Sequence, residues 1–293
     1  MNIRRIISLA AIALMATLVL IPLNVVLAQT SCNTVVVTNS NPSGWAFRVT
    51  APNGAGEYVE PAPGTPPAGQ GAAYLFTGDA GSGGANGDDS AQLRNGNYAG
   101  TLLSNITSLN YCTYVEQWNG SQAPYIIINV DTDGNGTTDD FLFFEPEYSN
   151  GGYNPSIPAQ PSPTTNTWQC WNALAGGWYS ANGLNGSGPG ADVQSFSDLV
   201  AAYPATASIA AGTGTTGAVR VLVGFASPTD VFKAYVDNFS IGVDGKCTTF
   251  DFEEFDTPSN AEQCKKGGWQ TFNPPAGPFK NQGQCIQYVN TGK

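Results

Sequence analysis

The feature that most constrains the fold is a series of short apolar runs, each bounded by turn-forming residues. The runs are rich in β-branched and aromatic residues and are too short for helices, so they are typical of β-strands. They cover residues 34–38, 45–50, 72–77, 106–118, 125–130, 141–144, 167–171, 218–225, 231–243 and 248–252. This pattern predicts an all-β protein, a two-sheet sandwich of the jelly-roll type.

One segment, residues 197–204, carries a helix signal. Ser197 is placed to cap the first turn, Asp198 puts a negative charge there, and Pro204 ends the segment. Residues 257–293 differ in composition, because four lysines stand against the single acidic residue Glu262 and strand patterns are scarce. We therefore expect a sandwich domain over residues 29–256 and a small basic C-terminal module over residues 257–293.

The N-terminus resembles a secretory targeting segment. Arg4 and Arg5 precede an apolar run over residues 6–28, and small residues before Gln29 suit a cleavage site. The alternative is an uncleaved membrane anchor, since the run is long enough to span a bilayer. Pro22 and the small-residue site favour cleavage. The sequence thus predicts a signal peptide over residues 1–28 and a secreted protein with no membrane contact after cleavage, extracellular or on a bacterial cell surface.

Charge and residue types exclude several functions. Residues 29–256 carry 21 acidic and five basic residues, a balance that repels nucleic acid and anionic lipid and suits bound cations. The chain has no histidine, which excludes Ser-His-Asp and Cys-His nucleophiles and His-ligated zinc. Any catalysis would rest on carboxylates, tyrosine, lysine or a metal, and no catalytic constellation is recognisable.

Six cysteines behind a signal peptide predict three disulfides. Six cysteines allow 15 pairings, so composition alone leaves the choice open. We expect one bond between the first and last strands, one between two strands of the same sheet, and one that closes a short C-terminal loop. These are Cys32–Cys247, Cys112–Cys170 and Cys264–Cys285.

The loop between the strands 125–130 and 141–144 has the composition of a hard-cation site. Side-chain or carbonyl oxygens recur along it, with glycines at the sharp turns, which is the chemistry that calcium prefers. The candidate calcium ligands are Asp131, Asp133, Asn135, Thr137, Asp139 and Asp140.

The loop follows the start of an EF-hand loop, including the glycine at its sixth position. It departs at the twelfth position, where Leu142 replaces the bidentate glutamate, and strands flank it rather than helices. Water, Glu145 or Glu147 would therefore have to complete the coordination. The competing interpretation is a solvated acidic hairpin turn, in which the same residue types are favoured.

Two further groups of residues invite functional interpretations. The aromatic residues Trp168, Trp171, Trp178 and Tyr179 would stack on sugar rings if exposed, or fill the core if buried. The acids Asp251, Glu253, Glu254 and Asp256 either include the paired carboxyls of a glycoside hydrolase or lyase, or are solvated residues that support a cation site. Their spacing favours the second interpretation.

Two segments resemble known proteins. The run Ala234–Ile241, with Asp237-Asn238 inside it, and the Ser43-Gly44-Trp45 triplet resemble jelly-roll carbohydrate-binding and concanavalin/laminin-G-like modules. The C-terminal residues Cys264-Lys-Lys-Gly-Gly-Trp269 and Phe279-Lys-Asn-Gln-Gly-Gln-Cys285 resemble a motif of uncharacterised secreted bacterial proteins. The first resemblance implies a sandwich and the second implies a Cys264–Cys285 bond; neither implies a catalytic residue.

Taken together, the sequence predicts a secreted, calcium-stabilised and disulfide-bonded β-sandwich. Its expected role is that of a non-catalytic glycan-binding or adhesive surface protein, with a glycan or cell-surface polymer as its partner. The alternatives are a carboxylate enzyme on a jelly roll and a structural component of the cell envelope. Paired carboxyls in an aromatic-lined groove would favour the enzyme, whereas an aromatic surface without paired acids would favour binding.

Overall fold

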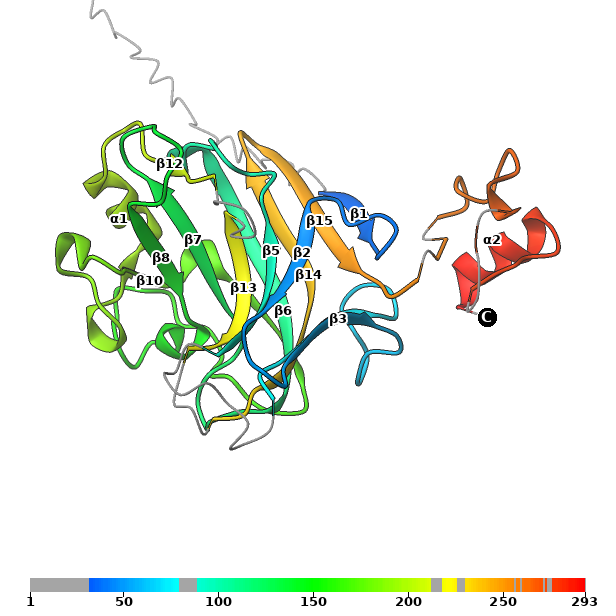
Figure 1. Cartoon of the computed structure of the whole chain (residues 1–293), viewed down its shortest axis with the longest axis horizontal. Coiled ribbons are helices and arrows are strands. Elements are labelled where there is room, and N and C mark those ends of the chain that lie inside the picture. Colours follow the sequence, from blue (N-terminus) through cyan, green and yellow to red (C-terminus); the bar gives the residue numbers. More distant parts are fainter. Residues whose placement is uncertain are drawn as a thin grey trace, which may run out of the picture.

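Two β-sheets form the body of the protein (Figure 1). The computed structural model describes residues 32–78, 89–211, 218–225, 230–255, 257–258, 260–270, 272 and 276–292. The predicted signal peptide, residues 1–28, and Asp256 lie outside the described residues.

The first sheet is organised around the long strand β14. Its strands are β1 (Asn33–Val37), β15 (Lys246–Phe252), β14 (Lys233–Val243), β4 (Ala72–Phe76), β3 (Ala55–Val59), β6 (Ile106–Gln117) and β9 (Trp168–Asn172). Strand β14 pairs with β6 along one edge; on the other edge its neighbour changes from β4 to β15. The first and last strands, β1 and β15, lie side by side and parallel.

The second sheet carries the acidic hairpin. Its strands are β11 (Gln194–Ser195), β10 (Gly177–Ser180), β8 (Asp140–Phe144), β7 (Tyr125–Asp131), β13 (Val219–Gly224), β5 (Ser90–Asn95) and β2 (Trp45–Val49), with β12 (Ser208–Ile209) paired to β7. Short 3-10 turns occur at Leu103–Asn105, Pro146–Ser149, Ala173–Ala175, Leu184–Gly186, Gly190–Asp192 and Gly268–Gln270.

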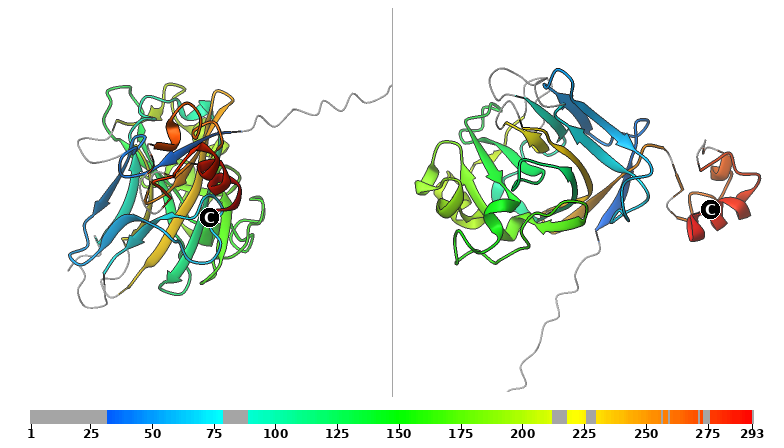
Figure 2. Two further views of the ribbon diagram at one scale, coloured as in Figure 1. Left: turned by 90° about the vertical axis from the view of Figure 1, so that its right-hand side faces the viewer. Right: turned by 90° about the horizontal axis from the view of Figure 1, so that it is seen from below.

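Alternating side chains from the two sheets meet in one core, because successive residues of a strand point to opposite faces. Seen from below in Figure 2, the sheets surround this common interior. Trp45 anchors it: its indole packs edge-on against Phe239, Phe250 and Phe252, with ring centroids 4.9 to 5.3 Å apart. The two-sheet sandwich predicted from the sequence is thus confirmed.

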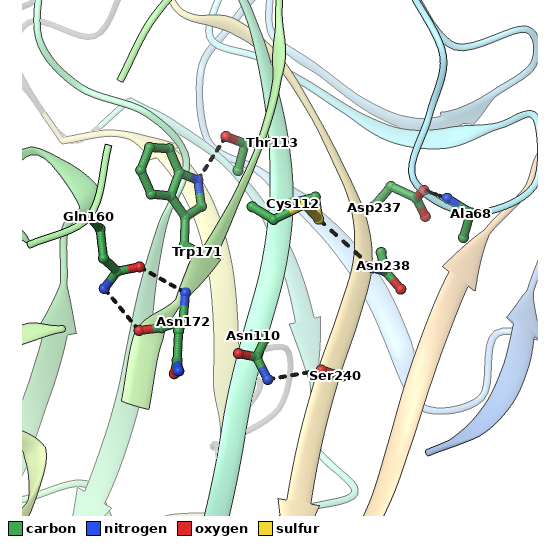
Figure 3. The surroundings of a disulfide bond; sticks show 11 residues. Ala68, Asn110, Cys112, Thr113, Gln160, Trp171, Asn172, Asp237, Asn238 and Ser240 are labelled. Carbon is green, nitrogen blue, oxygen red and sulfur yellow. Dashed lines mark hydrogen bonds between the residues drawn. A yellow bond between two sulfur atoms is a disulfide. The ribbon is translucent and has the colours of Figure 1, made fainter. Parts of the chain in front are cut away.

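All three expected disulfides are confirmed. Cys32–Cys247 joins the start of β1 to β15, and Cys112–Cys170 connects directly paired positions of β6 and β9. Figure 3 shows the surroundings of a disulfide on β6, where Asn238 donates to Cys112 Sγ over 3.8 Å. Cys264–Cys285 lies in the C-terminal segment.

Some elements differ from the prediction. Strands β3, β5 and β10 and the two-residue strands β11 and β12 form where no strand was expected, because each is held by pairing with neighbouring strands rather than by a strong local pattern. Helix α1 (Phe196–Ala202) is capped by Ser195, whose Oγ accepts from Asp198 N over 3.1 Å, and not by Ser197.

The C-terminal segment contains a helix, α2 (Gln282–Thr291), that the sequence pattern did not reveal. It packs on a small apolar cluster of its own, formed by Cys264, Phe272, Ala276, Phe279 and Cys285. In Figure 1 and in the right-hand view of Figure 2 this segment lies beyond the end of β15, to one side of the two sheets. Gln70 reaches it by donating to the Tyr288 hydroxyl over 3.4 Å.

Candidate functional site

The acidic loop between β7 and β8 is folded around the carboxylate of Asp131. This buried group accepts backbone N–H bonds from Asp133 (3.2 Å), Gly134 (2.7 Å) and Gly136 (2.7 Å). Gly134 and Gly136 have φ of +79° and +83°, a left-handed conformation that glycine adopts without strain. Burial opposes ionisation of Asp131, but these backbone donors outweigh it and lower the pKa of its carboxyl.

Three carboxylates converge in this loop. One oxygen from each of Asp131, Asp133 and Asp139 lies within 4.8 Å of the others. Asp133 and Asp139 are exposed, so an ion could reach them from solvent. The donor set of carboxylate oxygens in a glycine-rich turn fits calcium, which prefers several oxygen ligands in a flexible arrangement.

The other predicted ligands divide into two groups. Asn135 and Thr137 lie in the loop, where Asn135 Oδ1 accepts from Thr137 N over 2.7 Å. Asp140 points elsewhere: its carboxylate accepts from Ser180 Oγ and the Tyr203 hydroxyl, each over 2.6 Å. The prediction of Asp140 as a ligand does not fit this geometry, because Asp140 begins β8 and its buried side chain is directed to Ser180 of β10 and to Tyr203, which follows helix α1.

The four aromatic residues considered as a sugar platform do not share a surface. Trp171 and Trp178 are 1% and 0% exposed and belong to the core, where Trp171 Nε1 donates to Thr113 Oγ1 over 3.1 Å (Figure 3). Their core packing rules out an exposed stacking role. Trp168 is half-buried on the outer face of the first sheet, and Tyr179 is half-buried on the second sheet.

Tyr179 belongs instead to a groove of about 340 Å³ on the outer face of the second sheet. Five aromatic residues line it: Tyr125, Phe141, Phe143, Tyr179 and Phe225. The other lining residues are Gln122, Ile127, Glu145 and Arg220. The groove forms because the residues of β7 and β8 that alternate with core residues are themselves aromatic or aliphatic.

Register explains the order of side chains across the groove. Arg220 of β13 pairs with Ile127 of β7, Ile127 with Phe143 of β8, and Phe143 with Tyr179 of β10. The Phe143 and Tyr179 rings stack with centroids 4.9 Å apart. Neighbouring strands lie about 4.8 Å apart, so this row extends roughly 14 Å across the sheet.

Glu145 and Arg220 give the groove opposite polar ends. Burial raises the pKa of Glu145, although hydrogen bonds from the Tyr179 hydroxyl and from Gln122 oppose the shift. The Arg220 guanidinium carbon lies 5.3 Å from the centroid of the Phe141 ring, within the range of a cation–π contact. Among the described lining residues Glu145 is the only acid.

Sequence reasoning missed most of this groove. Phe141 and Phe143 alternate with the core residues Leu142 and Phe144, so the run 141–144 is apolar on both faces of its strand. An apolar outer face in a sandwich strand is a detectable signal, since that face normally contacts water. Arg220, by contrast, reaches the groove only through the pairing of β13 with β7.

The acids at the end of β15 form a separate cluster. Asp251 and Glu253 are 6% and 2% exposed, and Glu60 approaches them from the loop after β3. The sequence favoured solvated positions, but the loop over residues 60–71 covers the two acids; its Gln70 N–H, for example, donates to Glu253 over 2.8 Å. Glu254 accepts from Glu60 N over 3.1 Å.

Burial, together with the charge of Asp251, raises the pKa of Glu253 well above its usual range. Burial likewise raises the pKa of Asp251, and that of nearby Asp237 to about 7. With Glu253 protonated, its hydroxyl can donate to Asp251. Asp251 and Glu253 border a cavity of about 510 Å³, to which Tyr288 contributes the only aromatic ring among the described residues. The paired carboxyls and the aromatic groove are therefore at different places.

No protein-family model matches the chain, and no curated protein matches it significantly. Among the described residues, no helix has the length and apolar character needed to cross a membrane.

Proposed function

We propose that this protein is a secreted, calcium-stabilised β-sandwich that binds a glycan without cleaving it. The observation that carries this proposal is the aromatic groove on the outer face of the second sheet. Sugar rings present apolar C–H faces and many hydroxyls, and they suit a site with aromatic walls and a few polar groups. Glu145 and Gln122 supply hydrogen-bonding groups beside the aromatic residues.

The separation of acids from the groove supports binding over hydrolysis. Glycoside hydrolases use two carboxyls on either side of the bond that is cleaved. Glu145 is the only acid among the described groove residues, and Asp251 and Glu253 border a cavity with little aromatic surface. We therefore infer that Asp251 and Glu253 have a structural role, which is to fasten the loop over residues 60–71.

Secretion is supported by the predicted signal peptide and by three disulfides, since disulfides persist in oxidising compartments. Calcium is supported by the three converging carboxylates of the β7–β8 loop. This loop lies at the end of the two strands that carry Ile127 and Phe143, so a bound ion would hold one side of the groove. Its role would be structural.

The test is a glycan array probed with the mature protein in calcium, using the wild type and three single variants. Phe225→Ala and Phe143→Ala remove groove walls, and Phe225 is 45% exposed, so its loss leaves the fold intact. Trp168→Ala is the matched control, an aromatic residue on the other sheet. We expect the two groove variants to weaken binding about tenfold or more, equivalent to roughly 1.4 kcal/mol.

Failure would take either of two forms. Binding that Trp168→Ala abolishes and the groove variants leave unchanged would move the site to the first sheet. New reducing ends released from a bound glycan by the wild type, but not by Glu253→Gln, would establish the carboxylate enzyme instead.

A further inference from the structure

The arginines of the second sheet are gathered on the outer face that carries the groove. Five basic residues lie between residues 32 and 255, and three of them are Arg48, Arg94 and Arg220. Arg94 and Arg220 occupy directly paired positions of β5 and β13. Arg48, on the adjoining strand β2, pairs with Gln92 of β5. In a chain with a net charge of −11, this places like charges side by side.

Such an arrangement costs stability, because like charges directly opposite each other in a sheet repel. Burial and the charges of Arg220 and Arg48 lower the pKa of Arg94 to about 9. Burial, with a contribution from Arg48, lowers the pKa of Arg220 to about 10, although Tyr125 opposes the shift. The lowered pKa values of Arg94 and Arg220 indicate that their surroundings disfavour the positive charge.

Among the described residues, Arg48 and Arg220 have no acid in ion-pair contact. Arg94 Nε donates to the neutral amide oxygen of Gln92 over 2.9 Å. In the described part of the chain the ion pairs are Lys233–Glu116 and Lys265–Glu262, so neither Arg48 nor Arg220 takes part in one. Glu145, at the other end of the groove, is not within ion-pair distance of Arg220.

Arg220 is the arginine that lines the groove. It is 7% exposed, and its Nε is buried without a hydrogen-bond partner. Phe141 lies against its guanidinium and holds it in place. A guanidinium presents N–H groups in a planar fork that matches a carboxylate, and an unsatisfied buried donor is costly. A buried guanidinium with an unsatisfied donor in the wall of a groove indicates an anion-binding position.

We propose that the groove binds an acidic glycan, with the carboxylate of a uronic acid residue held by Arg220. Arg48 and Arg94 add positive potential behind it, the aromatic residues cover the sugar ring, and Glu145 accepts from a sugar hydroxyl at the far end. This inference rests on the proposed function, because it names the class of glycan for the same groove. It also resolves the apparent contradiction of an acidic protein that concentrates its arginines on one face.

The experiment measures binding of tetragalacturonate and of its methyl ester, which has the same sugar rings without charge. The variants are Arg220→Gln and, as a matched loss of one positive charge, Lys246→Gln on the exposed end of β15. We expect the wild type to bind the acid at least tenfold more tightly than the ester, and Arg220→Gln to bind the acid about tenfold more weakly. Lys246→Gln should bind as the wild type does.

A second measurement uses the wild type alone. Raising the salt concentration should weaken its binding of tetragalacturonate and leave any binding of the methyl ester unchanged. Equal binding of acid and ester, dependent on Phe225, would overturn the assignment to acidic glycans and leave the glycan site intact. Absence of binding to both, and to every glycan of the array, would overturn the proposed function as well.

Discussion

At the scale of single residues, the buried acids at the end of β15 are the most unusual chemistry outside the groove. Asp251, Glu253 and Asp237 are buried together; Asp237 accepts backbone N–H bonds from Ala68 and Phe252, and Glu253 accepts one from Gln70. Each has its pKa raised, by burial above all. A carboxyl whose pKa is higher in the folded than in the unfolded protein binds its proton more tightly when folded. It therefore stabilises the fold at low pH and loses this contribution as pH rises.

This gives a pH prediction. In chelator, the free energy of unfolding should fall between about pH 5 and pH 8, because unfolded carboxyls ionise near pH 4 and Asp237 ionises near pH 7 when folded. The expected loss is roughly 2–4 kcal/mol, and urea unfolding at the two pH values measures it. Glu253→Gln should reduce this loss, since glutamine stays neutral, and leave the part that Asp237 contributes. The exposed Glu57→Gln is the control, and stability that rises over this range would contradict the argument.

At the scale of one element, the β7–β8 hairpin contributes to the core, to the groove and to the acidic turn. Its inner residues fill the core, its outer residues line the groove, and its turn gathers three carboxylates. Because the strands are paired from Ile126 to Val130, a change at the turn is transmitted along a rigid ladder of hydrogen bonds. Calcium should therefore affect the stability of the sheet and the shape of one side of the groove.

The prediction for this element concerns thermal unfolding. An extracellular site with an affinity of roughly 0.1 mM, at about 1 mM calcium, adds about 1.4 kcal/mol to stability. This corresponds to a rise in the unfolding temperature of about 3–6 °C for a domain of this size. Replacing Asp131 and Asp133 together by alanine should abolish the rise, whereas the exposed Asp192→Ala should retain it. If calcium leaves the wild-type transition unchanged, the turn is a solvated hairpin.

At the scale of the whole molecule, the C-terminal segment is expected to unfold separately from the sandwich. It has its own disulfide and apolar cluster, and Gln70–Tyr288 is a polar contact between the two. A segment of this size buries too little apolar surface to be stable alone, so a covalent bond is needed to hold it together.

Removing that bond should unfold the segment and spare the sandwich. Closing a loop of 21 residues stabilises by about 3 kcal/mol on the loop-entropy model. Replacing Cys264 and Cys285 together by serine should therefore allow a protease to remove the segment, with the main unfolding transition unchanged. Differential scanning calorimetry and limited proteolysis report the two parts separately. A lowered main transition would mean that the segment stabilises the sheets.

How far the sequence predicts this molecule depends on the range of the interactions involved. Most strand positions, the acidic hairpin and the number of disulfides follow from local patterns, and the structure confirms the sandwich and all three cysteine pairs. Strands β3, β5, β10, β11 and β12 do not follow, because their local pattern is weak and pairing with other strands holds them. Helix α2 was not predicted for a similar reason. Contacts with Phe279 and the disulfide hold it, rather than a strong helical period in its sequence.

The sequence by itself determined which residues alternate, which segments are acidic and which chemistry is missing. Only the tertiary structure decided which face of each strand meets the core, which is why Trp178 is buried while its neighbour Tyr179 lines the groove. Only strand pairing brought Arg220 beside Arg94, and only the tertiary structure placed Asp140 against Ser180 and Tyr203. The physical reason is that period-two alternation defines two faces but does not say which is covered, and that long-range register sets every neighbour across a sheet.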